Sequence, residues 1–231
     1  MLTKLKQDLQ KLADTEKAKT LQRFFKTGKG EYGEGDVFLG ITVPDQRKIA
    51  KKHSDSTLKE VQKLLSGKIH EHRLTALLIL VIKYNKADER GKKEIVDFYL
   101  KNTKNINNWD LVDLSADKIL GAYLIDKDKS ILYKLVRSDN LWDRRIAIMA
   151  TFHFIKNGKF KDTLKISGML LNDKHDLIHK AVGWMLRETG KREQATEERF
   201  LKKYYKNMPR TMLRYATEQF DENKRKFYLK K

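Results

Sequence analysis

The sequence of 231 residues contains no cysteine. Disulfide bonds, thiolate zinc sites, cysteine-ligated iron–sulfur clusters and cysteine nucleophiles are therefore excluded. Zinc-dependent nucleobase deaminases are excluded for the same reason, because their metal site needs cysteine ligands. A chain without disulfides is typical of the cytoplasm, and a cytoplasmic location is expected.

Proline and long apolar runs are also scarce. Pro44 and Pro209 are the only prolines, so nearly the whole chain is free to form helix. The longest apolar run, residues 76–82, ends at Lys83 and is too short to span a membrane. The charged residues 1–6 lack the apolar segment of a secretory signal. Neither a membrane span nor an export signal is expected.

Positive charge is what the sequence has in excess. Lysine and arginine number 50 against 31 acidic residues, which gives a formal net charge of +19. A soluble mixed surface does not need such an imbalance, and a chain this basic attracts polyanions in a salt-dependent way. Nucleic acid is the favoured partner, with a membrane surface or an acidic protein as alternatives.

The dominant periodicity is helical. Leucines at 2, 5, 9 and 12 mark one face of an amphipathic helix, and residues 16–26 predict a second helix. Residues 27–35 hold four glycines and predict a loop; because the loop lacks a Gly-Lys-Ser/Thr ending, a phosphate-binding P-loop is not expected. Pro44 suits the first position of the next helix. The whole chain predicts more than ten helices and no sheet.

Four segments share a polar or aromatic residue followed by small and apolar ones. Their starts are separated by 36, 36 and 35 residues, and they are 73–80 (RLTALLIL), 109–116 (WDLVDLSA), 145–152 (RIAIMATF) and 180–187 (KAVGWMLR). Such a spacing predicts a HEAT-like helical-repeat α-solenoid that forms one domain over residues 1–231, with a concave face built by the inner helices. A non-repeating helical bundle is the alternative.

These inner segments carry the residues that could do chemistry. Trp109 and Asp113 are four residues apart and share one helix face, while Arg145, Trp184 and Arg187 recur in the later segments. A carboxylate in an apolar run needs a reason, because an unpaired buried charge is costly. A purely structural role is the alternative. In that case Trp109 and Trp184 are core aromatics, and Asp113 forms an ion pair with one of three arginines: Arg144, Arg145 or Arg187.

The histidines are weaker candidates. His175 and His179 are four residues apart, but two histidines without a third ligand do not make a metal site. His70 and His72 are two residues apart, a poor spacing for ligands on a helix, and are expected to face solvent or cap a helix. No metal and no cofactor is therefore predicted.

Four stretches carry a resemblance to a known family: 40–47 (GITVPDQR), 107–113 (NNWDLVD), 139–148 (DNLWDRRIAI) and 180–188 (KAVGWMLRE). In this order and spacing they resemble the motifs of the AlkD-type DNA alkylation repair glycosylases, and the likeness extends over roughly residues 10–220. The chain departs from some members at Asn108, where they carry a second tryptophan.

The resemblance implies a HEAT-like solenoid that holds double-stranded DNA in its concave face as a monomer. It also implies base excision repair by hydrolysis of the N-glycosidic bond of N3- and N7-alkylated purines such as 3-methyladenine and 7-methylguanine, without turning the base into a pocket. By match of motif, Asp113 would be the catalytic carboxylate, Trp109 and Trp184 would contact the sugar, and Arg145 would hold the DNA backbone. The further implied backbone contacts are Arg187, Thr42, Arg47 and Lys48.

The chemistry of these residue types agrees with that role. A cationic alkylpurine is a good leaving group that needs no general acid, so the difficulty is the positive charge that grows on the deoxyribose. A carboxylate stabilises that charge and positions water, and tryptophan faces favour the same cation. A helical-repeat DNA-binding relative without catalysis and a protein-binding scaffold remain as alternatives; the charge disfavours the scaffold.

Overall fold

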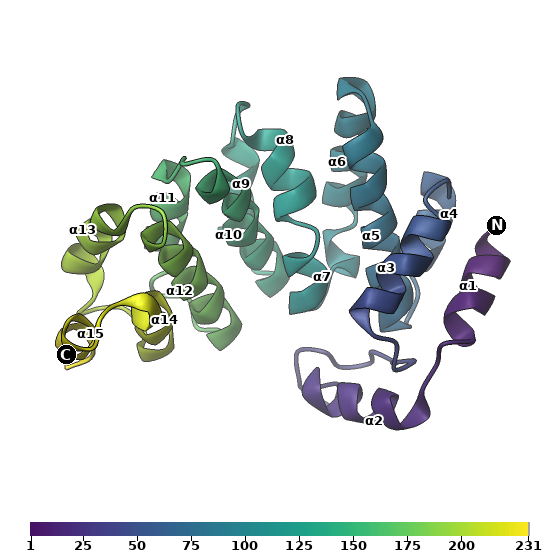
Figure 1. Cartoon of the computed structure of the whole chain (residues 1–231), viewed down its shortest axis with the longest axis horizontal. Helices are drawn as coiled ribbons and strands as arrows, with labels where there is room; N and C mark the ends of the chain where they lie inside the picture. The colour runs from purple at the N-terminus through teal and green to yellow at the C-terminus, as the bar shows by residue number, and fades with distance from the viewer. Residues whose placement is uncertain (231) are drawn as a thin grey trace. The chain divides into compact units, whose positions relative to one another are not determined.

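The computed structural model describes residues 1–230 (Figure 1). Within this span the regular structure is helical, and the only β-type pairing is a single parallel bridge between Val37 and Ile69. The prediction of an all-α chain is thereby confirmed. None of the described helices is both long and apolar enough to cross a membrane.

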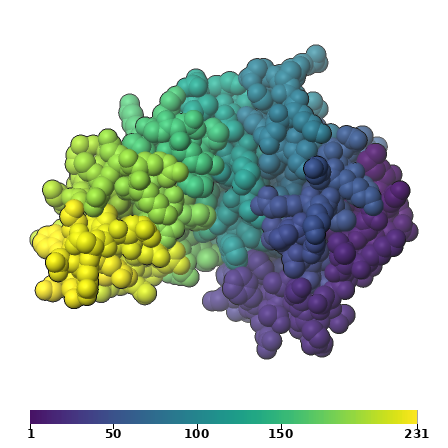
Figure 2. All heavy atoms as spheres, in the orientation of Figure 1, coloured from purple at the N-terminus to yellow at the C-terminus, as the bar shows by residue number. Residues whose placement is uncertain are grey.

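The chain divides into two compact units, of which the first is Met1–Ser115 and the second begins at Ala116. In a helical-repeat chain such a division is expected, because each helical pair packs mainly on its sequence neighbours. The space-filling view colours the first unit purple to blue-green and the end of the second unit yellow (Figure 2).

The first unit is built around one long buried helix, α5 (His70–Lys86), whose residues 70–81 are all buried. Because α5 is apolar or paired around its whole circumference, it behaves as a core element with neighbours on several sides. Helices α3, α4, α6 and α7 pack on it. The other elements of this unit are α1 (Leu2–Gln10), α2 (Thr15–Phe24), α3 (Val43–Lys52), α4 (Leu58–Leu65), α6 (Glu89–Lys101), η1 (Thr103–Asn105) and α7 (Trp109–Asp113).

The second unit has two layers of helices. One layer is a ladder in which η2, α10, α12 and α14 pack on one another in that order, while α9, α11 and α13 pack on the outside of α10 and α12. The elements are η2 (Asp117–Gly121), α8 (Ala122–Leu124), α9 (Ser130–Leu135), α10 (Leu141–Lys156), α11 (Lys161–Met169), α12 (Asp176–Gly190), α13 (Gln194–Tyr204), α14 (Arg210–Ala216), η3 (Thr217–Gln219) and α15 (Glu222–Leu229).

A glycine sets the closest approach within this ladder. A Cβ atom at Gly183 of α12 would lie 2.5 Å from the carbonyl oxygen of Met212 on α14. Real side chains do not tolerate such a distance, so only glycine lets the two backbones meet here. The apolar residues of α12 are thereby brought into contact with α14, and the ladder is close-packed at this point.

Helix starts follow local chemistry. The side chain of Asn140 accepts a hydrogen bond from the amide of Trp142 and caps α10. Helix α12 begins after His175, whose ring accepts from the amide of Leu177. The carboxylate of Asp173 accepts from the amide of His175 at 2.9 Å and pairs with Arg144 at 2.6 Å.

Candidate nucleic-acid interface

The short helix α7 presents two side chains at its ends and buries the three between them. Trp109 and Asp113 are partly exposed, while Asp110, Leu111 and Val112 are buried. A separation of four residues places Trp109 and Asp113 on the same face of the helix. The two candidate residues of this segment are therefore accessible side by side, in a helix that is otherwise part of the core.

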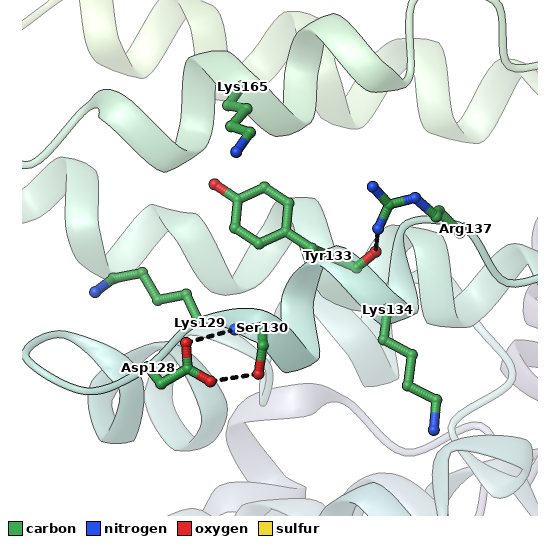
Figure 3. Close-up of a pocket in the computed structure, with 7 residues that line it drawn as sticks. All are labelled: Asp128, Lys129, Ser130, Tyr133, Lys134, Arg137 and Lys165. Atoms are coloured by element: carbon green, nitrogen blue, oxygen red, sulfur yellow. Dashed lines mark hydrogen bonds between the residues drawn. The ribbon is translucent and has the colours of Figure 1, made fainter.

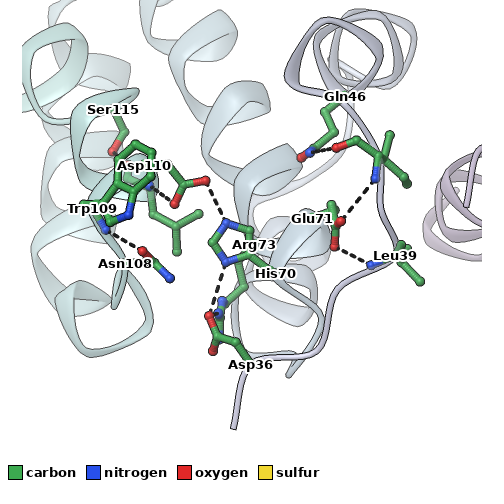
Figure 4. Close-up of polar contacts among 12 residues, drawn as sticks. Asp36, Leu39, Gln46, His70, Glu71, Arg73, Asn108, Trp109, Asp110 and Ser115 are labelled. Carbon is green, nitrogen blue, oxygen red and sulfur yellow. Dashed lines mark hydrogen bonds and ion pairs between the residues drawn. The ribbon is translucent and has the colours of Figure 1, made fainter. Parts of the chain in front are cut away.

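The start of α7 is fixed by the residue that departs from the family pattern. The side-chain oxygen of Asn108 accepts a hydrogen bond of 2.8 Å from the amide of Trp109. Asparagine is a preferred N-cap because this bond satisfies an amide that has no helical partner. Asn108 thus orients the first residue of α7, Trp109 (Figure 4).

The helix ends earlier than the sequence predicted. The repeat pattern indicated one helix through residues 109–116, but α7 stops at Asp113 and the chain resumes with a π-type turn from Asp117. The hydroxyl of Ser115 donates to the carbonyl of Leu111, 2.6 Å away, and contacts the hydroxyl of Tyr99. Such back-bonding competes with regular helix, and it leaves Asp113 at a helix end.

The indole of Trp109 rests on a stack of aromatic rings. Its ring lies parallel to that of Phe25, with centroids 5.0 Å apart, and edge-on to Phe24 at 5.9 Å. Phe25 stacks in turn on Phe38, and Phe38 stacks on His70 at 4.4 Å. Aromatic pairs at these distances add to the energy of burial, so α2 and the link before α3 hold the orientation of Trp109.

A buried charge network lies at the base of this stack. The two ring nitrogens of His70 contact two carboxylates, Nδ1 to Asp36 at 3.2 Å and Nε2 to Asp110 at 2.8 Å. Arg73 forms an ion pair with the same oxygen of Asp36. All four side chains are buried (Figure 4), and two positive groups balance two negative ones, which is the condition under which buried charge is tolerated.

The network keeps His70 protonated. Burial by itself disfavours the imidazolium, but the charge of Asp110 and the hydrogen bonds to Asp110 and Asp36 outweigh it and raise the pKa of His70 to about 9. For Asp36, burial alone would raise the pKa, but the hydrogen bonds from His70 and Arg73 prevail and lower it. At neutral pH both nitrogens of His70 therefore donate, and α5 is tied to the start of α7 through Asp110.

The prediction that His70 and His72 face solvent or cap a helix is wrong. Both lie on α5 and are buried. Unlike His70, His72 pairs with no acidic side chain among residues 1–230, and burial together with the charge of Lys6 lowers its pKa to about 4. At neutral pH His70 is therefore charged and His72 is neutral, although they lie in the same helix turn, because only His70 contacts carboxylates.

A carboxylate on α5 also fixes the segment that leads into α3. Glu71 accepts hydrogen bonds from three consecutive backbone amides, those of Leu39, Gly40 and Ile41, at 2.8–3.2 Å. Gly40 has a φ of +86°, and a Cβ there would lie 2.1 Å from the carbonyl oxygen of Asp14. Glycine is therefore required at this bend, and the entry to α3 is rigid.

The residues predicted to contact the DNA backbone come immediately after this bend in the chain. The Thr42 side chain caps α3 by accepting from the amide of Asp45, and its hydroxyl donates to the Asp45 carboxylate at 2.7 Å. Arg47 and Lys48 are exposed on α3, where Lys48 pairs with Asp45 at 2.9 Å. The amide end of α3 and two cations thus share one solvent-facing segment, an arrangement suited to phosphate.

The second unit carries the other predicted residues on α10 and α12. Arg145 is buried, 4% exposed, and one guanidinium nitrogen donates to the carbonyl of Leu177 at 2.5 Å. Trp184 is partly exposed, and its ring centroid lies 6.0 Å from that of Phe152. Arg187 forms ion pairs with Glu218 and Glu188. Trp184 is therefore accessible, while both arginines are engaged within the unit.

Two features of this unit were not predicted. Phe152 lies between Trp184 and two cations, with the amine of Lys156 at 4.5 Å from its ring centroid and the guanidinium of Arg192 at 6.0 Å. Lys156 also pairs with the buried Asp117 at 2.7 Å. Phe152 is the last residue of the third apolar segment, and nothing in that segment marks it as a cation-binding ring. The only sequence signal for its contact with Lys156 is their separation of four residues on one helix.

Sequence reasoning also missed the buried carboxylates that position α7 and α3. Asp36 and His70 are 34 residues apart in the chain, and His70 and Asp110 are 40 apart. No local pattern links residues at such separations. The described residues include no group of three or more histidine, aspartate and glutamate side chains arranged to hold a metal ion.

The sequence matches one family model, described as DNA alkylation repair enzyme, over residues 5–220. A search among curated proteins gives no match. The family match covers nearly the whole chain, and both compact units contribute to it.

Solved structures share the fold at low sequence identity. A predicted DNA alkylation repair enzyme from Enterococcus faecalis is 16% identical, with a TM-score of 0.70 and coverage of 91% of this chain and 97% of that one. AlkD2 from Streptococcus mutans is 18% identical, with a TM-score of 0.59 and coverage of 90% and 99%. The protein smu.31 from Streptococcus mutans UA159 is 20% identical, with a TM-score of 0.58 and coverage of 78% and 93%.

Proposed function

This chain belongs to the DNA alkylation repair enzyme family, and from that premise we propose that it is a DNA glycosylase. Its substrate would be double-stranded DNA that carries a positively charged N3- or N7-alkylated purine. It would hydrolyse the N-glycosidic bond and release the free base, the first step of base excision repair. The net charge of +19 supports binding to the phosphate backbone without reading sequence.

Asp113 would carry the chemical step. As the bond to the alkylated purine breaks, the electron pair leaves with the base, which becomes neutral, and the deoxyribose gains oxocarbenium character. A carboxylate beside the sugar stabilises that charge and accepts a proton from the water that attacks C1′. The face of Trp109 favours the same cation. No acid is needed for the departing base, and the proposed step involves no nucleophilic side chain.

The observation that supports this role best is the exposure pattern of α7. The three residues between Trp109 and Asp113 are buried, and these two alone are accessible on the helix. Trp109 packs against a core cluster of Ala18, Phe25 and Phe38 and still keeps part of its surface exposed. The aromatic stack and the His70 network support the proposal further, because they hold the helix that would face the sugar, and catalysis by a fixed charge depends on such preorganisation.

Trp184 is accessible on α12 and would contact the sugar together with Trp109. The other predicted residues would contact the DNA backbone, and of these Arg47 and Lys48 are exposed cations beside the amide end of α3. Arg145 is buried and bonded to the carbonyl of Leu177, so its contribution would include shaping the start of α12. Arg187 would have to exchange its ion pair with Glu218 for a phosphate.

The deciding experiment measures base release from duplex DNA that contains 7-methylguanine or 3-methyladenine. We expect wild type to release the base and Asp113→Asn to lose about two to three orders of magnitude in single-turnover rate while it retains DNA affinity. Asp97→Asn, which removes a carboxylate from the surface of α6, is the matched control and should be as active as wild type.

Each outcome has a clear meaning. Wild type that binds DNA and releases no base would favour a DNA-binding relative without catalysis. Release that survives Asp113→Asn unchanged would overturn the proposed chemistry and leave the repair family assignment intact. Loss of release in Asp97→Asn as well would point to unfolding, which a melting curve detects.

A further inference from the structure

A basic groove lies between α9 and α11, in the outer layer of the second unit. Its volume is about 640 Å³, and it is lined by Asp128, Lys129, Ser130, Tyr133, Lys134, Arg137 and Lys165 (Figure 3). Every one of these residues lies on α9, on α11 or next to α9. None belongs to α10 or α12, the ladder helices that carry Arg145 and Trp184.

The groove is lined by four cations and one carboxylate, so its net charge is positive. Lys165 lies over the ring of Tyr133 at 4.5 Å, Arg137 donates to the carbonyl of Tyr133, and Lys129 donates to that of Lys127. Lys134 is exposed. Among the described residues, none of these four cations forms an ion pair with an acidic side chain. Elsewhere Lys19, Lys93 and Lys180 pair with acidic residues three or four positions away on the same helix, and the groove cations do not.

Two carboxylates lie nearby and offset part of this charge. Asp128 accepts hydrogen bonds from the hydroxyl and the amide of Ser130, and these bonds, with the charge of Lys129, lower its pKa. Asp162 accepts from the hydroxyl of Tyr133 at 2.6 Å. Four cations against two carboxylates leave an excess of positive charge around the groove, and an anion that entered would offset that excess.

The shape and composition of the groove favour a phosphate chain over a protein. A protein interface needs buried aromatic or aliphatic anchors at its centre. The large exposed hydrophobic residues of the described chain include none that lines the groove. Lysine and arginine around a wide, open surface match the contacts made to a nucleic-acid backbone, which are electrostatic and independent of sequence.

We propose that the α9–α11 groove binds the phosphate backbone of a nucleic acid, in addition to any contact made through α10 and α12. The contact goes beyond the proposed glycosylase site, because it needs no lesion and no Asp113. It gives one chain two separate surfaces for DNA. One molecule then holds a second duplex, or a distant part of the same DNA, while the other surface is occupied.

The test uses a short undamaged duplex as the probe and counts how many bind per chain by titration calorimetry. The groove variant combines Lys134→Glu, Arg137→Glu and Lys165→Glu. The matched control combines Lys63→Glu, Lys101→Glu and Lys104→Glu, three exposed lysines of the first unit whose replacement changes the net charge equally. Melting curves confirm folding, and a milder set of glutamine substitutions replaces any variant that does not fold.

We expect two duplexes per chain for wild type and for the control, and one for the groove variant. The slope of log K against log salt should weaken by about one for each phosphate that the groove variant no longer binds. Excision of an alkylated base should be the same in the groove variant as in the control. An equal reduction of DNA binding in both variants, or two duplexes retained by the groove variant, would overturn the proposal.

The outcome separates this proposal from the proposed function. If wild type binds a single duplex and the groove variant binds none, the groove is the DNA-binding surface and the proposed site on α7 is not supported. If wild type excises bases and the groove variant keeps both duplexes, the glycosylase stands and the groove proposal is wrong. Polyglutamate is the competitor at matched ionic strength; preferential binding of polyglutamate in the groove would assign it to an acidic protein.

Discussion

The two units hold their candidate DNA-facing residues by different physical means. In the first unit, Trp109 and Asp113 depend on rings and buried charges that come from far along the chain. In the second unit, Trp184 lies on a helix ladder that is packed closely enough to require Gly183, and the charges beside it pair at the surface, as Arg187 does with Glu218.

The contrast teaches where precision would come from in each unit. A buried ion network contributes little net stability, because the cost of desolvating its charges offsets their attraction. It nevertheless holds the charged side chains in a single geometry, since any other would leave a buried charge unpaired. Close packing contributes stability and is sensitive to small changes of side-chain volume. The placement of α7 is therefore expected to respond to charge and pH, and the placement of α12 to side-chain volume.

The largest expected effect comes from removing one charge of the buried network. Asp110→Asn leaves His70, Arg73 and Asp36 with an excess positive charge in the core, and should lower the free energy of unfolding of the first unit by about 3–5 kcal/mol. Glu218→Gln breaks the half-exposed pair of the second unit and should cost less than about 1 kcal/mol. Both free-energy changes are measured by denaturation in urea, in which hydrogen exchange of peptides from each unit reports the unfolding of that unit.

A double variant controls this comparison. Asp110→Asn combined with His70→Gln removes the excess charge and should recover part of the lost stability, since the two residues act through each other. The contrast between the units would be refuted by equal costs for Asp110→Asn and Glu218→Gln, or by strictly additive effects of Asp110→Asn and His70→Gln.

The next effect is a dependence on pH that differs between the units. The folded pKa of His70 is about 9, above its ordinary 6.5, so the folded state holds its proton more tightly. The stabilisation is complete below about pH 6.5 and is lost as pH rises through 9; a shift of this size corresponds to about 3 kcal/mol. His70→Gln should remove this dependence from the first unit.

The second unit has a different window. Burial and the neighbouring charge of Glu198 raise the pKa of Glu197 from 4.5 to about 9. Its folded state also holds an extra proton, so the contribution of Glu197 to the second unit should be lost from about pH 4.5 upward. His153 and His175 have lowered pKa values and contribute in the opposite direction, so the effect is measured as the difference between wild type and Glu197→Gln. Hydrogen exchange at several pH values should show this difference changing between about pH 5 and 6 in the second unit; a difference that does not change with pH in that range would contradict the prediction.

The smallest expected effect is on DNA affinity, when one arginine is removed from each unit. Arg47→Ala and Arg145→Ala should each weaken DNA binding and lower the slope of log K against log salt by about one. Only Arg145→Ala should also destabilise its unit, because it removes the donor that holds the carbonyl of Leu177. Titrations at several salt concentrations, with melting curves, check both; an unchanged slope for either variant would rule out its phosphate contact.

Much of the fold was predictable because its signals are local. Runs of apolar residues identified α5 and α10 as core helices. The glycine-rich stretch was also predicted correctly as a loop, in which Glu31 and Glu34 accept hydrogen bonds from the amides of Gly28 and Gly30. Membership of the family followed from four motifs in order.

The rest depended on contacts between distant residues. His70 gives no sign of burial in its own turn of sequence, because its two partners are 34 and 40 residues away. The end of α7 at Asp113 was missed because Leu114, Ser115 and Ala116 continue an apolar pattern, while the bond from Ser115 to Leu111 is visible only in three dimensions. The roles of Asp113, Trp109, Trp184 and Arg145 in DNA repair remain predictions.

The protonated state of His70 has a consequence for a protein that would work where alkylating agents are present. Such electrophiles attack thiolates and the free lone pair of a neutral imidazole. The chain has no cysteine, and His70 has no free lone pair at neutral pH, since each nitrogen carries a proton directed at a carboxylate. Burial and protonation therefore protect the side chain that ties α5 to α7 from the same agents that create the lesions.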